Sequence, residues 1–240
     1  MELKSMVEKR VKEAENRLKD FRISREKLAS YIDHTILKPD ATEKIIERVA
    51  REALEYGFKS VCVNPSRVVM VREILKDSNV ETCSVVGFPL GAHTTYMKAR
   101  ETEEAVKNGA TEIDMVINIG WLKDGDYERV KEDIKAVVDA AQGNVVKVII
   151  ETCYLTFEEK VRATELVVDA GAHFVKTSTG FGTHGATPFD VALLSIVSDG
   201  KIKVKAAGGI RTYKDAALMI LSGADRIGAS RSIDIIKGIK

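Results

Sequence analysis

The chain contains few of the residues that mark exported or membrane proteins. It has three cysteines, Cys62, Cys83 and Cys153, whose spacing forms neither a disulfide framework nor a CxxC motif. It also lacks proline-rich tracts and apolar runs of membrane-spanning length. The first residues, MELKSMVEKR, are too charged for a secretory signal. These absences predict a cytoplasmic protein that has no membrane partner.

An excess of charge of one sign is missing too. The 37 basic and 36 acidic residues leave a net charge of +1, which provides no general attraction for nucleic acid. The four histidines do not form an HxxxH pattern, so the sequence predicts no metal site. A composition that is 45% hydrophobic and 30% charged is typical of a globular domain with a large core.

A fourfold internal repeat is the most informative pattern in the chain. The segments EYGFKSVCV, KNGATEIDMV, DAGAHFVKT and LSGADRIGA each carry one glycine, at Gly57, Gly109, Gly171 and Gly223. In each segment we expect the glycine to end a helix in the left-handed conformation, with a strand following directly. Four other apolar segments supply further strands, at residues 30–37, 81–88, 144–151 and 201–209.

Eight strands separated by amphipathic helices predict a single (β/α)8 TIM barrel, with a doubly wound parallel sheet as the alternative. Helix starts are predicted at Asp40, Thr156 and Thr212, because an acidic residue follows each three positions later. We expect residues 1–28 to form an N-terminal helical extension that the barrel does not require. Residues 29–240 would form the barrel and carry the catalytic site.

The alternation of side chains along each strand predicts which residues point into the barrel. The apolar residues in each strand suit the side that faces the helices, so the intervening residues point inward. The predicted inward set is Asp114, Lys147, Ile149, Glu151, Lys176, Lys203 and Lys205. Four consecutive strands therefore each direct at least one ionisable group into the interior.

This inward set contains more cations than carboxylates, and buried charge must be compensated. One interpretation is a salt-bridge network that only fills the barrel. The other is a reactive lysine, because a second ammonium about 5 Å away disfavours the charged form by roughly 3 kcal/mol at an effective dielectric of about 20. A neutral lysine readily forms a Schiff base with a carbonyl compound. We predict that Lys176 is neutral rather than paired with a carboxylate.

Two glycine-containing loops predict a phosphorylated ligand. AGGIR, residues 207–211, follows the seventh strand, and IGASR, residues 227–231, follows the eighth. These are the positions where such barrels commonly bind phosphate through backbone N–H groups. Arg211 and Arg231 provide positive charge nearby.

The ordered motifs resemble those of the deoxyribose-phosphate aldolase family, which are class I aldolases with a (β/α)8 barrel. The motifs are IDHTILKPDAT (32–42), CVNP (62–65), VVGFPLG (85–91), EIDMVINIG (112–120), KVIIET (147–152), FVKTSTGF (174–181), KAAGGIRT (205–212) and RIGAS (226–230). The resemblance implies reversible cleavage of 2-deoxy-D-ribose 5-phosphate to D-glyceraldehyde 3-phosphate and acetaldehyde, without metal or cofactor. It also implies a homo-oligomer.

The same resemblance assigns roles to individual residues. Lys176 would form the Schiff base, Lys205 would perturb it, and Asp114 would take part with Lys205 in proton transfer. Lys147 and Glu151 would be supporting charges. The residues implied to bind the phosphate or the sugar are Gly180, Gly208, Gly209, Gly228, Ser230, Thr179, Asp33 and Thr35. Some relatives carry a phosphate-binding lysine where this chain has Phe181.

Two other functions remain open at this stage. The chain could be a different phosphate-binding barrel enzyme, such as another class I aldolase, a transaldolase or an isomerase. It could also be a sugar-phosphate-binding barrel that performs no chemistry.

Overall fold

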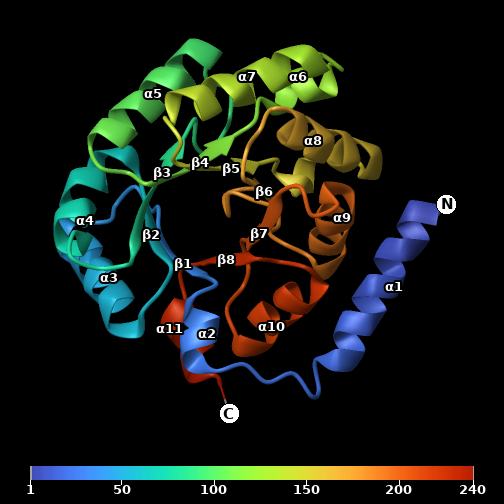
Figure 1. The fold of residues 1–240 in the computed structure, drawn as a ribbon, viewed down its shortest axis with the longest axis horizontal. Coiled ribbons are helices and arrows are strands. Elements are labelled where there is room, and N and C mark those ends of the chain that lie inside the picture. The colour runs from blue at the N-terminus through green and yellow to red at the C-terminus, as the bar shows by residue number, and fades with distance from the viewer. Residues whose placement is uncertain (1, 240) are drawn as a thin grey trace.

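The computed structural model describes residues 2–239, and its centre is a closed barrel of eight parallel strands (Figure 1). Neighbouring strands pair in chain order, and the eighth pairs with the first. The predicted TIM barrel is therefore confirmed, and the doubly wound sheet is excluded. The strands are β1 (Ile32–Ile36), β2 (Ser60–Val63), β3 (Glu81–Val86), β4 (Glu112–Val116), β5 (Val145–Ile149), β6 (Phe174–Lys176), β7 (Lys203–Ala207) and β8 (Arg226–Ala229).

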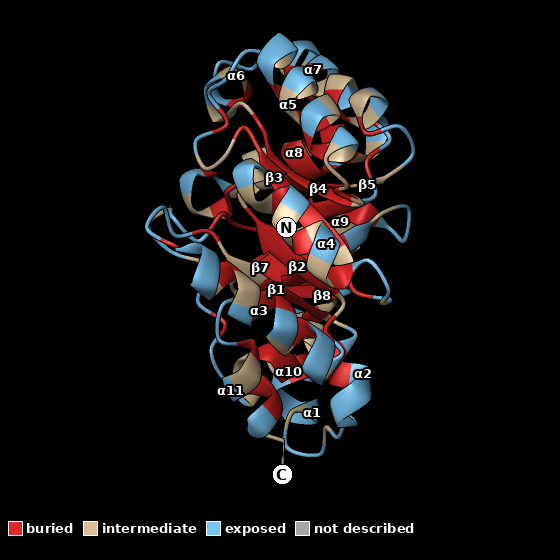
Figure 2. Cartoon of the chain, turned by 90° about the vertical axis from the view of Figure 1, so that its left-hand side faces the viewer, coloured by how far each residue is buried: buried red, intermediate tan, exposed pale blue. Residues whose placement is uncertain are grey.

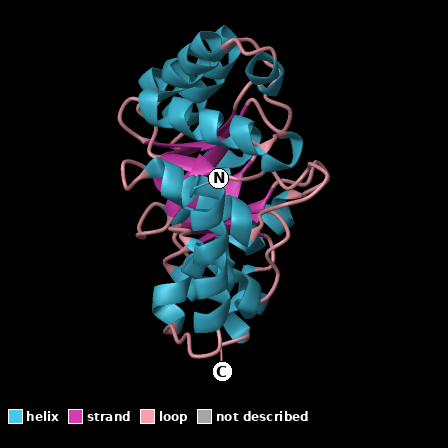
Figure 3. Ribbon diagram, turned by 90° about the vertical axis from the view of Figure 1, so that its right-hand side faces the viewer, coloured by secondary structure: helices cyan, strands magenta, loops and turns pink. Residues whose placement is uncertain are grey.

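Helices surround the barrel on its outer side (Figure 3). They are α1 (Glu2–Arg17), α2 (Arg25–Ala29), α3 (Glu43–Tyr56), α4 (Val68–Leu75), α5 (Thr95–Lys107), α6 (Ile119–Lys123), α7 (Tyr127–Ala140), α8 (Phe157–Asp169), α9 (Pro188–Ser198), α10 (Tyr213–Ser222) and α11 (Ser232–Lys237). Short 3₁₀ turns at Pro65–Arg67 and Thr152–Tyr154 follow β2 and β5. Within the described residues, no helix has both the length and the apolar character needed to cross a membrane.

The predicted helix ends and starts are largely confirmed. The four repeat glycines all have positive φ values, between 66° and 119°. Thr156 and Thr212 each form a capping box with the acidic residue three positions later. The start predicted at Asp40 is wrong, because α3 begins after Thr42, which holds the N-cap position.

The apolar core lies between the strands and the surrounding helices. Val146, Val148 and Ile150, predicted to face the helices, are fully buried in this layer together with apolar residues from α3, α7 and α8. Figure 2 shows the strands as the most deeply buried part of the chain. The barrel interior is therefore free to hold polar side chains, which come from the alternate positions of the same strands.

The N-terminal helix α1 packs against the outside of the barrel rather than closing one of its ends. It lies beside α9 and α10 (Figure 1). Val7 is fully buried in a cluster with Ala192 and Leu193 of α9, and the Arg10 guanidinium donates to Ser195 Oγ at 3.0 Å. A short helix, α2, follows α1 and contacts α11.

Candidate active site

Seven charged side chains meet inside the barrel, and six of its strands supply one or two of them each. Four are cations and three are carboxylates. All are buried, with at most 6% of any residue exposed. They are Asp33 (β1), Glu112 and Asp114 (β4), Lys147 (β5), Lys176 (β6), Lys205 (β7) and Arg226 (β8).

Asp114 is the centre of this cluster. Its Oδ1 accepts from Lys147 Nζ at 2.8 Å, and its Oδ2 accepts from Lys176 Nζ at 2.7 Å and from Lys205 Nζ at 2.6 Å. The structure thus brings together the three residues predicted to perform the chemistry. It also corrects one expectation, because Lys176 has a carboxylate contact. That carboxylate is shared with two other lysines, since the strands β4 to β7 direct all four side chains to one point.

The other charged residues connect with one another beneath Asp114. Lys205 Nζ lies 2.6 Å from Asp33 Oδ2, and Lys147 Nζ lies 2.7 Å from Glu112 Oε2. Arg226 joins the two acids, donating to Glu112 Oε2 at 2.8 Å and to Asp33 Oδ1 from its Nε at 2.8 Å. Glu112 and Arg226 were not among the residues predicted to point inward. Strand alternation was the available signal, because each lies two residues from a predicted inward or site position, Asp114 and Gly228.

The buried charges stabilise one another strongly. Burial alone would raise the pKa of Asp114, but Lys147, Lys176 and Lys205 outweigh this and hold the pKa well below its ordinary value. Burial would likewise lower the pKa of Lys205, yet the nearby Asp114 and Asp33 raise it above its ordinary value. Lys205 therefore remains an ammonium near neutral pH, and it can act as a proton donor but not as a nucleophile.

A cavity of about 390 Å³ opens at the carboxyl ends of the strands, directly above this cluster. Lys176 lines it, so the end of β6 connects the buried charges with the space that a ligand could enter. Most of the predicted ligand-binding residues line it too: Thr35, Thr179, Gly180, Gly208, Gly209, Gly228 and Ser230. Arg211, Arg231 and Phe181 complete part of its wall.

The structure corrects two predicted positions, Asp33 and Lys203, and defines the contacts of a third, Glu151. Asp33 is fully buried and paired with Lys205 and Arg226, so it supports the charged cluster and does not reach the cavity. Glu151 is buried with a positive backbone φ of 53°, and its carboxylate accepts from the Thr179 backbone N–H at 3.2 Å. Lys203 has the predicted parity, but it is exposed at the start of β7, far along the strand from the cavity.

Two cysteines lie next to Asp114. Among the described residues, Cys62, Cys83 and Asp114 could each offer a ligand atom, and these atoms lie within 4.8 Å of one another. Hydrogen bonding explains this grouping, because Cys83 Sγ donates to Asp114 Oδ1 at 3.2 Å while both carboxylate oxygens also accept from lysines. We therefore assign no metal to this group.

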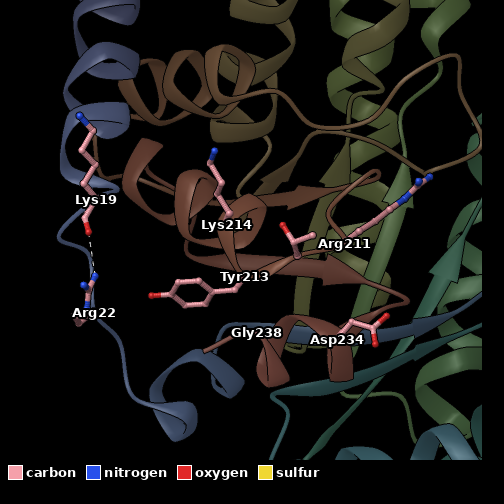
Figure 4. Close-up of a pocket in the computed structure, with 8 residues that line it drawn as sticks. Lys19, Arg22, Arg211, Tyr213, Lys214, Asp234 and Gly238 are labelled. Carbon is pink, nitrogen blue, oxygen red and sulfur yellow. Dashed lines mark hydrogen bonds between the residues drawn. The ribbon is translucent and has the colours of Figure 1, made fainter. Parts of the chain in front are cut away.

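A second cavity, of about 540 Å³, lies between the end of α1 and the start of α10 (Figure 4). Four cationic side chains line it: Lys19, Arg22, Arg211 and Lys214. Figure 4 shows that these cationic groups do not converge, since Lys214 and Arg211 point in different directions. Arg211 also lines the first cavity, at the carboxyl ends of the strands. Of these two cavities, the first is lined by a lysine, Lys176, whose Nζ contacts a buried carboxylate.

The closed (β/α)8 barrel with a cavity at the carboxyl ends of its strands places the chain in the class of barrel enzymes, and an inward lysine at that cavity suits Schiff-base chemistry. The sequence model of the DeoC/LacD family aldolases matches residues 27–237. The chain belongs to this family of aldolases.

Similar proteins carry consistent names. A deoxyribose-phosphate aldolase of Carboxydothermus hydrogenoformans is 57% identical over 221 residues, which covers 90% of this chain and 97% of that protein. Two solved structures are also similar. A putative deoxyribose-phosphate aldolase of Coccidioides immitis has a TM-score of 0.88 at 41% identity, covering 90% of this chain and 87% of that one. The tetrameric deoxyribose phosphate aldolase of Aeropyrum pernix has a TM-score of 0.86 at 35% identity, covering 95% of both chains.

Proposed function

We propose that this protein is a deoxyribose-phosphate aldolase, which reversibly cleaves 2-deoxy-D-ribose 5-phosphate to D-glyceraldehyde 3-phosphate and acetaldehyde. The observation that carries the proposal is the position of Lys176, which lines the cavity while its Nζ contacts the shared Asp114 carboxylate. The names of the similar proteins support this substrate and reaction.

Lys176 is the nucleophile because of its contacts and its access to the cavity. Its partner Asp114 is already occupied by Lys147 and Lys205, whereas Lys205 also has Asp33 and Lys147 also has Glu112. Lys176 thus has the fewest carboxylate contacts of the three lysines. Lys147 and Lys205 are fully buried and keep their protons.

The reaction begins when the neutral Lys176 amine attacks C1 of the open-chain sugar. Loss of water from the carbinolamine gives an iminium ion, which withdraws the electron pair of the C2–C3 bond as that bond breaks. The C3 hydroxyl loses its proton and becomes the aldehyde of glyceraldehyde 3-phosphate. The remaining enamine takes a proton at C2, and water then releases acetaldehyde from Lys176. Asp114 and Lys205 accept and donate these protons.

The phosphate group would bind on the side of the cavity formed by the loops after β7 and β8. Gly208, Gly209 and Gly228 carry no side chain there, so backbone N–H groups can approach an anion, and Ser230 adds a hydroxyl. Arg211 and Arg231 supply the positive charge that a lysine in place of Phe181 would otherwise provide. Gly180 belongs to the same phosphate-binding set, and Thr179 and Thr35, which line the same cavity, would contact the sugar.

The oligomeric state, the cellular location and the bounds of the catalytic unit are further parts of the proposal. We propose that the chain forms a homo-oligomer, in keeping with the tetramer of the Aeropyrum pernix relative. Its few, widely spaced cysteines suit a reducing cytoplasm. We also propose that residues 29–240 form the catalytic unit and that the preceding helical segment is an addition to it.

Reductive trapping tests the proposed chemistry. Acetaldehyde with cyanoborohydride should leave an ethyl group on Lys176, which peptide mapping by mass spectrometry would locate. Lys176→Met should lose this label and the cleavage activity. Lys205→Met should retain some label but lose most of the cleavage rate. Lys203→Met is the matched control, because it removes an exposed lysine from the same strand as Lys205, and it should behave as the unmodified enzyme does.

The outcomes separate the candidate functions. A label on another lysine would overturn the assignment of the nucleophile. A chain that binds the sugar phosphate without any label or cleavage would instead be a sugar-phosphate-binding barrel. Labelling of Lys176 with no cleavage of 2-deoxy-D-ribose 5-phosphate would leave the Schiff base in place and overturn the substrate.

A further inference from the structure

Six of the seven buried charges form a closed ring, in which each group contacts the next. In order, the ring is Asp114, Lys147, Glu112, Arg226, Asp33 and Lys205, with Lys205 returning to Asp114. Each member thus has one oppositely charged neighbour on either side. Asp114 has a third contact, to Lys176, which lies outside the ring.

The ring is electrically balanced without Lys176. It holds three carboxylates and three cations and hence no net charge, whereas protonated Lys176 adds a positive charge whose carboxylate contact, Asp114, is shared with two other cations. A buried charge needs compensation, and Lys176 shares its one carboxylate contact with two other cations. The neutral form that Schiff-base chemistry requires leaves the six charges of the ring paired among themselves.

Two members of the ring lie far from any reacting atom. Glu112 and Arg226 begin β4 and β8, two residues before Asp114 and Gly228 respectively. Neither lines the cavity, and both are buried. The guanidinium of Arg226 lies over the Phe174 ring at 5.9 Å from its centroid, on the side of the barrel opposite the cavity mouth.

We propose that Glu112 and Arg226 are positioning residues that, from the far side of the ring, determine the pH at which Lys176 gives up its proton. This inference rests on the proposed function of Lys176. Neither residue touches the substrate. Each acts through its charge and its ring contacts, Glu112 through Lys147 and Arg226 through Asp33 and Lys205.

Two thiols and one further buried carboxylate also lie near Lys176. Burial raises the pKa of Cys83, which keeps that thiol neutral, and a hydrogen bond involving Cys83 lowers the pKa of Cys62. Both come from neighbouring strands, β2 and β3. Glu151 lies nearby at the end of β5, but its carboxylate is engaged by Thr179. Cys62→Ala therefore serves as a second background, because it removes the thiol that could add a negative charge.

The experiment measures the initial rate of reductive ethylation of Lys176, by acetaldehyde and cyanoborohydride, from about pH 5 to about pH 10. Glu112→Gln removes a negative charge. The loss of that charge destabilises the protonated form of Lys176, so the pH of half-maximal labelling should fall. Arg226→Met removes a positive charge, so the same midpoint should rise. Each shift should be roughly one pH unit, as expected for one buried charge at this range.

Three further variants separate charge from structure. Glu112→Gln with Arg226→Met restores the balance, so its midpoint should return close to that of the unmodified enzyme. Arg226→Lys keeps the charge and should leave the midpoint in place. Glu81→Gln is the matched control, because Glu81 pairs with Lys59 at a partly exposed position outside the ring, and it should shift nothing. If Arg226→Met does not fold, Arg226→Gln, whose amide can still donate to Asp33, takes its place.

The possible results are distinct. Absence of label on Lys176 in the unmodified enzyme would overturn the proposed function itself. With labelling present, equal midpoints in all variants, or shifts of Glu112→Gln and Arg226→Met in the same direction, would overturn the role of the ring. Opposite shifts that cancel in the double variant, in both the native and the Cys62→Ala backgrounds, would support it.

Discussion

At the scale of single residues, Glu151 joins the loop after β5 to the loop after β6, which lines the cavity. Its backbone has a positive φ, which turns the carboxylate toward the loop after β6. There it accepts from the backbone N–H of Thr179 at 3.2 Å and from the Thr179 hydroxyl, while the Thr179 hydroxyl oxygen accepts from the Phe181 N–H at 3.0 Å. Thr179 thus orders the start of the glycine loop rather than only facing a ligand.

We expect Thr179→Val to weaken substrate binding. The variant keeps the size of the side chain but leaves the buried Glu151 with fewer donors, which costs about 1–3 kcal/mol and loosens the loop. The KM for 2-deoxy-D-ribose 5-phosphate should rise roughly tenfold. Thr183→Val is the control, because Thr183 is exposed in the same loop. Steady-state kinetics of the two variants would show equal KM values if the hydroxyl of Thr179 had no ordering role.

At the scale of secondary structure, a buried ion pair connects α5 with α7 and with the end of β4. Lys98 Nζ donates to Asp133 Oδ2 at 2.5 Å and to the Val116 carbonyl at 2.9 Å, and both charged side chains are fully buried. Burial lowers the pKa of Lys98, although Asp133 opposes this. Val116 ends the strand that carries Asp114, so this pair helps to position the catalytic strand.

Breaking this pair should strongly destabilise the fold. Lys98→Met leaves the Asp133 carboxylate buried without its ammonium, and we expect a loss of about 3–5 kcal/mol in the free energy of unfolding. Adding Asp133→Asn removes the isolated charge and should recover part of that loss. Denaturant unfolding of both variants would measure this. A double variant no more stable than Lys98→Met would show that the isolated charge is not the cause.

The elements themselves could be predicted from sequence because their signals are local. A left-handed glycine after a helix and a capping box at Thr156 depend on a few adjacent residues, and strand alternation gave the inward direction of Lys147, Lys176 and Lys205. Ion pairs between side chains of distant strands could not be predicted in this way. The contact of Glu112 with Arg226 joins β4 to β8, residues far apart in the chain, and depends on how the strands close. The shared Asp114 contact of Lys176 was missed for the same reason.

At the scale of the whole molecule, α1 covers an apolar surface that the barrel would otherwise expose. Val7 and Ala14 are buried, and Val7 packs against Ala192 and Leu193 of α9. Neither α1 nor its contacts reach the residues that line the cavity above Lys176. The helix therefore contributes to stability, and the catalytic geometry does not depend on it directly.

Val7→Asp should separate the contribution of α1 to stability from any contribution to the catalytic geometry. A carboxylate at this buried position would undock α1, so the melting temperature should fall by several degrees, as expected for a loss of about 1–3 kcal/mol. Labelling of Lys176 by acetaldehyde below that temperature should continue. Ser5→Asp introduces the same charge at an exposed position of α1 and should leave the melting temperature unchanged. Loss of labelling in Val7→Asp at low temperature would show that the reactivity of Lys176 depends on the docking of α1.

The loops after β6 and β7 meet backbone to backbone at Gly185 and Gly208. A Cβ on Gly208 would lie 2.9 Å from the Gly185 Cα, and the Ala186 N–H donates to the Ala207 carbonyl at 3.0 Å. Neither loop can change its length or gain a side chain here unless the other changes with it. Natural variation at this edge of the cavity must therefore arise in pairs of substitutions. Redesign for bulkier aldehydes is better begun at Lys38 after β1, which also lines the cavity and has an exposed side chain.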